Sequence, residues 1–495
     1  MIRSEWIKFR SVPGWLGAVT GVIAAVVALG GLAAAGVHQS CMNGTVEVHC
    51  PPPPTGPGGE AVDDRFSFVH RPLTGDGELT AKVGGLRGII TYPPPDHDEI
   101  VPGLVPWTKA GIMVKAGLTP GDAYAAVLLT ARHGVRMQSD FTRDTAAPGF
   151  PAVVWLRVRR TGEVITGYAS ADGTAWHEIG TARLAGLPAT AQIGLFVASP
   201  GDVTAEASPL GGSIVASRFT QATADFSQVT PAGGWTFDKI GRDGPGTDWE
   251  KTHPSGVIES AGVLTITGSG DIAPSGHEAG MAPENILTGL NLALFVVIVV
   301  AVSFVTAEYR TGLMRTTLAA SPVRGRVLAA KAVVIALVTF VAGLIAAGLT
   351  LPLADHILRS NAVALIPVPP WTSARVVLGT AALLSLAALF AYGIGTVLRR
   401  GLAAVVLAAV LLILPYLLAT TSILPDSAAD WLMRVTPAAG FAIRQTVIAY
   451  PQVVHPYTPA DGYYPLAPLA GLGVFALYTA TALGLGWWRL RRADA

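Results

Sequence analysis

The chain has 495 residues, of which 51% are hydrophobic and only 14% are charged, and its mean hydropathy is +0.48. So little charge is unusual for a soluble domain and is typical of a membrane protein. The formal net charge of +1 gives no bulk electrostatic reason to expect a nucleic-acid partner.

The N-terminal segment, residues 1–13, has an amphipathic pattern. Ile2, Trp6 and Phe9 recur at helical spacing, and the cations occupy other faces. This pattern predicts a short helix that lies in the lipid headgroup region on the cytoplasmic side. The apolar stretch 14–37 follows it and is long enough to cross a bilayer, which favours a first membrane span over a cleaved signal peptide.

A linker, residues 38–61, follows this span, and its stretch PPPPTGPGG predicts a stiff spacer. Both cysteines of the chain, Cys41 and Cys50, lie in the linker. If the linker is outside the cytoplasm, the two thiols are predicted to form a disulfide that closes a small loop. Two free thiols are the alternative.

Residues 62–284 carry a different pattern, in which short β-type runs are separated by Gly, Asp and Pro turns. Val154, Leu156 and Val158 alternate with polar or aromatic neighbours, as the residues of a half-buried strand do. Many short strands at this spacing predict a sandwich or a barrel. We therefore expect an all-β domain inserted between the first and second membrane spans.

The apolar pattern resumes after residue 285, in runs close to the ~20 residues that a membrane-spanning helix needs. The predicted fold class is an α-helical polytopic membrane protein with six transmembrane helices and one inserted β domain. The further spans are predicted at 286–307, 329–353, 375–397, 402–422 and 466–488, with a cytoplasmic loop at 308–328, an outer loop at 423–465 and a cytoplasmic tail at 489–495.

The distribution of Lys and Arg between the short loops predicts how the chain is oriented. The N-terminal segment, the island 307–331, the turn at 399–400 and the C-terminal tail together carry thirteen such residues, and the short loops on the opposite side carry four. An excess of Lys and Arg marks the cytoplasmic side. We therefore expect a multi-pass protein of the plasma membrane, with both termini in the cytoplasm and residues 38–284 outside it.

Several motifs of catalysis and energy coupling are missing from the sequence. No stretch matches the GxxxxGK[ST] motif of P-loop ATPases, and none matches HExxH or a pair of CxxC motifs. No span carries an acidic or basic residue near its middle, which argues against a proton-coupled carrier. We therefore expect no catalytic residues, no metal ligands and no cofactor in this chain. The stretch 96–99, DHDE, could bind a metal, but its Pro-rich surroundings favour a solvated turn.

The membrane part of the chain, residues 1–37 and 286–495, resembles the permease subunits of ABC-2 type transporters, of the actinobacterial type. The resemblance is carried by the start IRSEWIKFRSV, the island EYRTGLMRTTLAASPVRGRVLAAK, the turn LRRGLAAV and the C-terminus WWRLRRADA. It implies an exporter permease that forms a homodimer or heterodimer in the lipid bilayer. It also implies a separate ATP-binding cassette subunit that holds ATP and Mg.

In the permeases that this chain resembles, the cytoplasmic loop after the second span contacts the ATPase. The stretch TGLMRTTLAA also has helical spacing, and its cations could engage an acidic groove. Positive-inside anchoring is the alternative role of the same cations, and one loop can serve both. The residues that we expect to couple the permease to the ATPase are Glu308, Tyr309, Arg310, Gly312 and Arg315.

Residues 62–228 resemble the concanavalin A-like (laminin G-like) jelly-roll sandwich, most clearly in the stretches 107–115 and 168–179. Residues 235–274 look like the strand pair that normally opens such a domain. We expect this segment to pack back onto the domain and complete its sheet, as in a circular permutation.

The same resemblance implies that the β domain binds glycan or cargo. Trp107, Tyr168 and Trp176 are then possible glycan-binding residues, because aromatic rings can stack on sugars. Aromatic residues of a sandwich core are the alternative reading of all three.

Two other classes of protein compete with a permease. A membrane-anchored carbohydrate-binding or cell-surface sensor protein would explain the outer domain, but it would need neither six spans nor the basic island. A tethered glycosidase would need two carboxylates that face each other at ~5–10 Å. The acids available for this role are Asp63, Asp64, Asp76 and Glu78.

Overall fold

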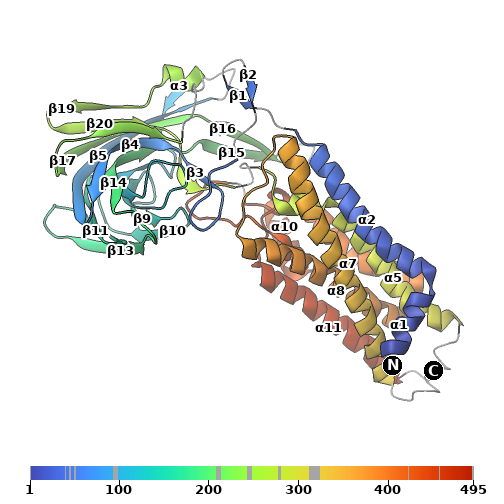
Figure 1. Ribbon diagram of the computed structural model, residues 1–495. Helices are drawn as coiled ribbons and strands as arrows, with labels where there is room; N and C mark the ends of the chain where they lie inside the picture. The colour runs from blue at the N-terminus through green and yellow to red at the C-terminus, as the bar shows by residue number, and fades with distance from the viewer. Residues whose placement is uncertain are drawn as a thin grey trace.

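The computed structural model places a bundle of long helices beside a β domain (Figure 1). The β domain lies at one end of the bundle, which we call the sandwich end. The first helix and the last turns of the last helix lie at the opposite end, which we call the termini end. The structure describes residues 2–38, 41–43, 46–48, 52–92, 99–207, 213–241, 248–276, 280–311, 324–421, 423–455 and 457–492.

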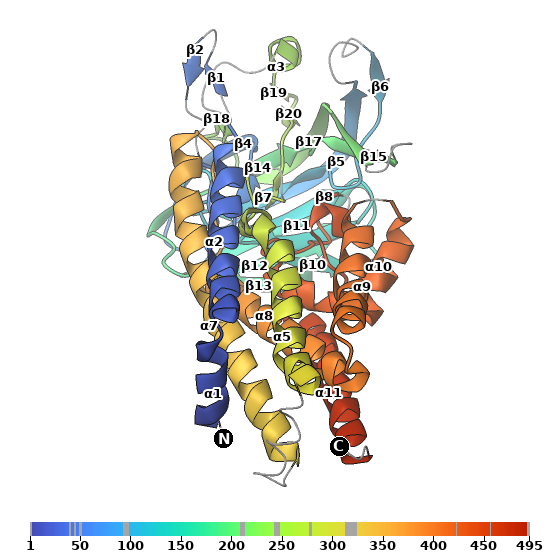
Figure 2. The same cartoon turned by 90° about the vertical axis from the view of Figure 1, so that its right-hand side faces the viewer.

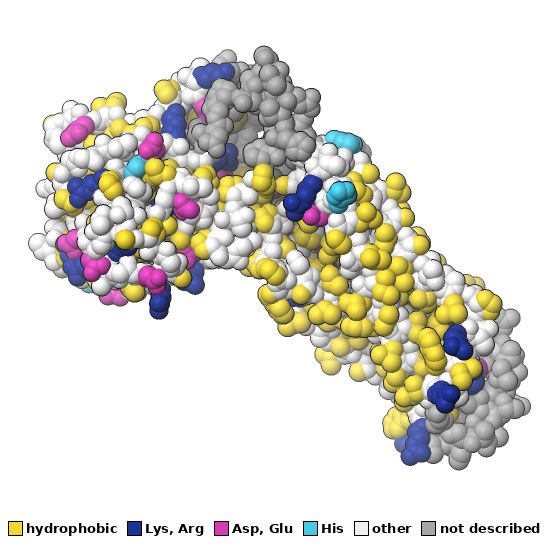
Figure 3. Space-filling view, viewed as in Figure 1, with side chains coloured by type: hydrophobic (Ala, Val, Ile, Leu, Met, Phe, Trp, Pro, Cys, Tyr) yellow, Lys and Arg dark blue, Asp and Glu magenta, His cyan; other side chains and the backbone are white. Residues whose placement is uncertain are grey.

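Among the described residues, six helices are long and apolar enough to cross a membrane, as the sequence predicts. The visible surface of the bundle is dominated by hydrophobic side chains, whereas the β domain displays a mixture of charged and polar ones (Figure 3). The six helices are α2 (Pro13–Ala35), α5 (Leu290–Thr311), α7 (Arg324–Ser360), α8 (Pro370–Leu398), α9 (Gly401–Thr420) and α11 (Pro468–Arg492).

Shorter helices complete the bundle. Helix α1 (Ile2–Ser11) precedes α2, and α4 (Pro283–Ile286) with η2 (Leu287–Gly289) leads into α5. The predicted outer loop 423–465 contains three helical segments, which are α10 (Asp426–Val435), η3 (Pro437–Arg444) and η4 (Pro459–Asp461). Every residue of η3 is buried, in contact with α8, α9 and α11, so this part of the loop is a component of the bundle.

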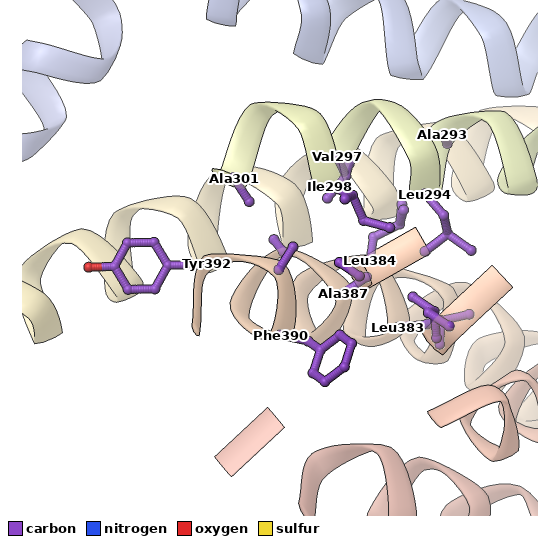
Figure 4. Close-up of a cluster of buried hydrophobic side chains, with 14 of the residues drawn as sticks. Ala293, Leu294, Val297, Ile298, Ala301, Leu383, Leu384, Ala387, Phe390 and Tyr392 are labelled. Atoms are coloured by element: carbon purple, nitrogen blue, oxygen red, sulfur yellow. The ribbon is translucent and has the colours of Figure 1, made fainter. Parts of the chain in front are cut away.

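The core of the bundle lies between α5 and α8. Alanine residues on both helices let the two backbones approach closely, and larger apolar side chains fill the space beside them (Figure 4). The labelled residues of this core are Ala293, Leu294, Val297, Ile298 and Ala301 on α5, and Leu383, Leu384 and Ala387 on α8. Phe390 points away from α5 and packs on Phe475 of α11, and the Tyr392 hydroxyl donates to the carbonyl of Leu328 on α7.

The β domain consists of two antiparallel sheets packed face to face over one hydrophobic core. The inner sheet, on the bundle side, has the order β10–β9–β8–β7–β14–β4–β18, and the outer sheet has the order β13–β12–β11–β5–β17–β20–β19, with β6 paired to β5. The inner strands are β4 (Phe66–Thr74), β7 (Lys109–Lys115), β8 (Tyr124–Thr130), β9 (Val135–Ser139), β10 (Arg143–Ala147), β14 (Thr190–Ala198) and β18 (Thr236–Ile240). The outer strands are β5 (Gly77–Thr91), β6 (Ile100–Pro102), β11 (Val154–Thr161), β12 (Val164–Ser170), β13 (His177–Arg183), β17 (Thr220–Thr230), β19 (Gly256–Ser260) and β20 (Val263–Gly268).

The alternation seen in the sequence sets which face of each strand is buried. Val154, Leu156 and Val158 on β11 point into the core, whereas Trp155 and Arg157 lie on the opposite, half-exposed face. Because side chains of a strand alternate between faces, this pattern fixes the register of the whole sheet.

The segment 235–274 packs back onto the domain, as expected from the sequence. Strand β18 pairs with β4, and β20 pairs with both β17 and β19. The two halves of the segment do not pair with each other, however, because β18 joins the inner sheet and β20 the outer one. Each half therefore covers a strand edge that would otherwise leave backbone groups unpaired.

Two further strands lie in the connections between the β domain and the helices. Strands β3 (Val62–Asp64) and β21 (Ile272–Pro274) pair with each other. Lys115 Nζ on β7 lies 2.6 Å from Asp64 Oδ2, and both side chains are fully buried. Lys109 Nζ lies 2.6 Å from Asp271 Oδ1 in a second buried pair. These pairs fix both connections to the inner sheet, and burial raises the pKa of the Asp64 carboxyl above its usual value.

A small hydrophobic cluster joins the β domain to the bundle. Ala61, Ala282, Ile366, Val447 and Tyr463 pack together there, from both connections, from the loop between α7 and α8 and from the outer loop. The side chain of Gln452 also donates a hydrogen bond of 3.1 Å to the carbonyl of Phe141. The β domain is therefore seated on the bundle by packing as well as by its covalent connections.

The remaining elements are small. Strands β1 (Cys41–Asn43) and β2 (Val46–Val48) form a hairpin, β15 (Asp202–Ala207) pairs with β16 (Ser213–Arg218), and α3 (Asp248–Thr252) precedes β19. Cys50 lies outside the described residues, as do residues 96–98, so the disulfide and the solvated turn stay predictions.

Candidate functional site

Four charged side chains meet at the termini end of the bundle. Lys331 Nζ donates to Glu5 Oε2 and to Glu308 Oε1, each at 2.7 Å. Lys8 Nζ bridges the same two acids, at 2.9 Å from Glu5 Oε1 and 3.1 Å from Glu308 Oε1. We call Glu5, Lys8, Glu308 and Lys331 the charge cluster. It joins three helices, α1, α5 and α7, which lie beside one another at this end (Figure 2).

The charge cluster is largely shielded from solvent. Lys331 is 1% exposed, Glu5 3% and Glu308 7%, while Lys8 is half-exposed at the rim. Two acids face two bases, so the cluster has no net charge. Such an arrangement tolerates burial only while all its partners are present, because removing one leaves an uncompensated buried charge.

Local sequence places these side chains together. Glu5 and Lys8 are three residues apart on α1 and so share one face of the helix with Phe9. Phe9 is fully buried, and its ring packs on those of Trp15 at 5.6 Å and Phe304 at 5.5 Å. This aromatic contact anchors α1 against α5 and holds Glu5 over Lys331.

The predicted coupling residues fall at this site only in part. Glu308 belongs to the charge cluster, so its Oε1 is engaged inside the protein rather than presented to a partner. Tyr309 is half-buried, with the Arg399 guanidinium 5.3 Å from its ring. The side chain of Arg310 lies outside the described structure, as do Gly312 and Arg315, so their predicted role is untested.

Sequence reasoning missed the pairing of Glu5, Lys8 and Lys331 with Glu308. One signal was available: Glu5 is the sole acid of residues 1–13, and Glu308 is the sole acid of residues 308–328. A lone acid in a strongly basic segment of a membrane protein suggests a specific ionic partner.

The aromatic residues proposed for sugar binding separate into two places. Tyr168 and Trp176 lie on the exposed face of the outer sheet, where Arg159 and Arg157 stack on their rings. Trp107 is instead 4% exposed and stacks on His133 with the ring centroids 4.0 Å apart. Trp107 is therefore a core residue, which is the alternative that the sequence left open.

The acids considered for glycosidase chemistry have structural roles. Asp64 pairs with Lys115 inside the domain, and Asp63 pairs with Arg65. Asp76 accepts a hydrogen bond from the backbone of Gly162, and Glu78 pairs with Arg159. Within the described residues, no group of three or more His, Cys, Asp and Glu side chains is placed to hold a metal ion.

Comparisons with known proteins leave the family open. No family model and no curated protein matches the chain. Similar solved structures include a functionally unknown protein from Saccharomyces cerevisiae (18% identity, 35% of this chain and 75% of that chain, TM-score 0.19). A mutant of the GH43 protein BlXynB from Bacillus licheniformis is also similar (14% identity, 35% of this chain and 27% of that chain, TM-score 0.18). So is SCP-B of the Eqolisin family of peptidases (7% identity, 42% of this chain and 98% of that chain, TM-score 0.23). TM-scores this low carry no argument about function.

Proposed function

We propose that this chain is the membrane-spanning permease subunit of an ABC-2 type exporter, driven by a separate ATP-binding subunit. In this proposal the termini end faces the cytoplasm of a cell bounded by its plasma membrane. The β domain, a concanavalin A-like jelly roll, stands outside the cell and binds glycan or cargo.

The charge cluster is the observation that carries the proposal. The segment 308–328, which is predicted to contact the ATPase, begins at Glu308 near the end of α5. It ends in the first turns of α7, just before Lys331. A displacement of this segment would act first on the two helix ends that the cluster ties together. Because the cluster also holds Glu5, the same displacement would reach α1 and then α2. Buried ionic networks of this kind are stiff, since each member loses several partners when it moves.

The spans leave room for a second permease. Leu292, Phe295 and Val299 form an exposed apolar stripe on α5, and α9 exposes Val406 and Val410 among others. Such stripes suit contact with lipid or with another permease chain. A transport path between two permeases, lined by α5 and α9, is the arrangement implied by the family that the membrane part resembles.

Co-purification with an ATPase tests the proposal. The chain would be expressed in its native host, purified together with any ATPase that co-purifies, and placed in lipid nanodiscs. We expect the two proteins to purify together and the permease to stimulate ATP hydrolysis. Failure to form a complex, or hydrolysis that is identical with and without the permease, would contradict the proposal.

A further inference from the structure

The two sheets of the β domain differ in what covers their outward faces. The bundle-facing side of the inner sheet is covered by β3, β21 and the buried pairs that fix them. The outward side of the outer sheet lies away from the bundle (Figure 1) and carries half-exposed side chains of β5, β11 and β12. This second face is the one that is open to solvent.

A strip of alternating rings and cations runs across the open face. The Arg157 guanidinium lies 3.8 Å from the ring centroid of Trp176, and that of Arg159 lies 5.8 Å from the ring centroid of Tyr168. Arg157 is directly opposite Tyr168 in the ladder between β11 and β12, so the two stacks are neighbours. We call Trp155, Arg157, Arg159, Tyr168 and Trp176 the aromatic–arginine strip.

One end of the strip is shaped by a tight turn. Gly173 has a φ of +81°, and a Cβ atom on it would lie 2.7 Å from the Trp155 ring. Glycine is therefore required for the turn to close over this ring. A cavity of about 420 Å³ adjoins the turn, lined by Asp172, His177 and Glu178 among others. His177 follows Trp176 directly in the chain, but the strip residues themselves do not line this cavity.

The strip carries positive charge that the protein does not neutralise. Arg159 pairs with Glu78, but both side chains are about half exposed, so the pair is weak. Within the described part of the chain, neither Arg157 nor Lys82 has a carboxylate partner, and Lys82 lies directly opposite Trp155. A stacked guanidinium is held in place while its planar fork can still bind a carboxylate or a phosphate.

We propose that the aromatic–arginine strip binds an anionic polysaccharide, a sugar chain that bears carboxylate or phosphate groups. The aromatic rings offer flat apolar surfaces for the C–H faces of sugar rings. Arg157 and Lys82 pair with the acidic groups. The strip points away from the bundle, which favours a polymer in solution or in a cell wall over a lipid headgroup. The proposal deepens the glycan binding of the proposed function, and it rests on that function for placing the β domain outside the cell.

Affinity electrophoresis of the full-length protein in nanodiscs tests this binding. The probes are polygalacturonate as the anionic polymer, dextran as the neutral one, and phosphatidylglycerol vesicles as the lipid surface. We expect retardation by polygalacturonate alone. Arg157→Gln and Trp176→Ala should each weaken it about tenfold, because a charge-assisted contact is worth at least one such factor. Arg157→Lys should weaken it as well, since the charge stays but the planar fork is lost.

Arg183→Gln is the matched control. Arg183 is an exposed cation of the same sheet, paired with Glu163 and outside the strip. Equal weakening in this control, equal retardation by dextran, or binding only to the vesicles would overturn the proposal, as would undisturbed binding in the strip variants. Melting temperatures confirm that each variant is folded. Stimulation of a partner ATPase is expected to be unchanged in all of them, so this test and the test of transport fail independently.

Discussion

Lys331 shows that the burial of a single residue in this protein can differ from what its position in the sequence predicts. It begins a predicted span and counts, in the sequence, as one of five island cations, yet it is almost fully buried. The acids that make this possible lie 326 and 23 residues away along the chain. The residue types were visible in the sequence, but no local pattern reports a pairing over such distances. The charge cluster could therefore be suspected from two lone acids, but its geometry could not be predicted.

Removal of one partner of a buried pair in the β domain should be costly. Lys115→Met leaves Asp64 buried without its cation, for a loss of about 3–5 kcal/mol. For a domain of this size, the loss corresponds to a fall of about 6–20 °C in the melting temperature of the β domain. Differential scanning fluorimetry of the full-length protein measures it.

The double variant Asp64→Leu/Lys115→Met separates charge from packing. It should recover most of the lost stability, because no unpaired charge remains buried. A double variant as unstable as Lys115→Met would mean that the pair matters for its shape rather than for its charge.

At the scale of elements, the sequence predicts which helices and strands form better than it predicts which of them pack or pair with each other. Apolar length located all six described helices that are long and apolar enough to cross a membrane, since a bilayer demands a minimum span. Hydropathy marked only the central part of α7, which extends beyond the predicted 329–353 because the helix continues into polar turns at both ends. Alternation identified β11, whereas the separation of β18 and β20 into different sheets depends on contacts that are distant in the chain.

The docking of α1 should depend on Phe9. Phe9→Ala removes a fully buried ring at a cost of about 3–5 kcal/mol and should release α1 from α5. Trypsin cleavage after Lys8 and Arg10 should then become several-fold faster in nanodiscs. Ile7→Ala, a change on the exposed side of the same helix, should leave the rate unchanged. Equal rates in both variants would argue that α1 is not held by this ring.

The whole molecule combines a lipid-suited bundle with a rigidly seated β domain. Near the β domain, both connections are held to the inner sheet by the buried pairs on β7. This arrangement suits a device in which events on the two sides of a membrane are linked. It also explains why the outer sheet, rather than the inner one, offers a free face.

The proposed orientation predicts which surfaces are reachable from outside the cell. With Cys41 and Cys50 replaced by serine, Ala171→Cys on the β domain should react with an impermeant maleimide in intact cells. Ser11→Cys, at the last residue of α1, should react only once the membrane is permeabilised. Labelling of Ser11→Cys in intact cells would mean that the orientation is the opposite of the proposed one. The proposed site of contact with the ATPase would then lie on the wrong side of the membrane.

The central claim is that the charge cluster passes force between a partner ATPase and the spans. The most direct measurement is permease-stimulated ATP hydrolysis in nanodiscs for Glu308→Gln and Lys331→Gln. Arg359→Gln serves as the control, because it removes an exposed paired cation at the opposite end of α7. We predict that both cluster variants are less stable than the parent protein, because one buried charge loses its partner, but remain monodisperse and bind the ATPase. They should lose stimulation by about fivefold or more, while the control keeps it. Full stimulation in folded cluster variants would contradict the account.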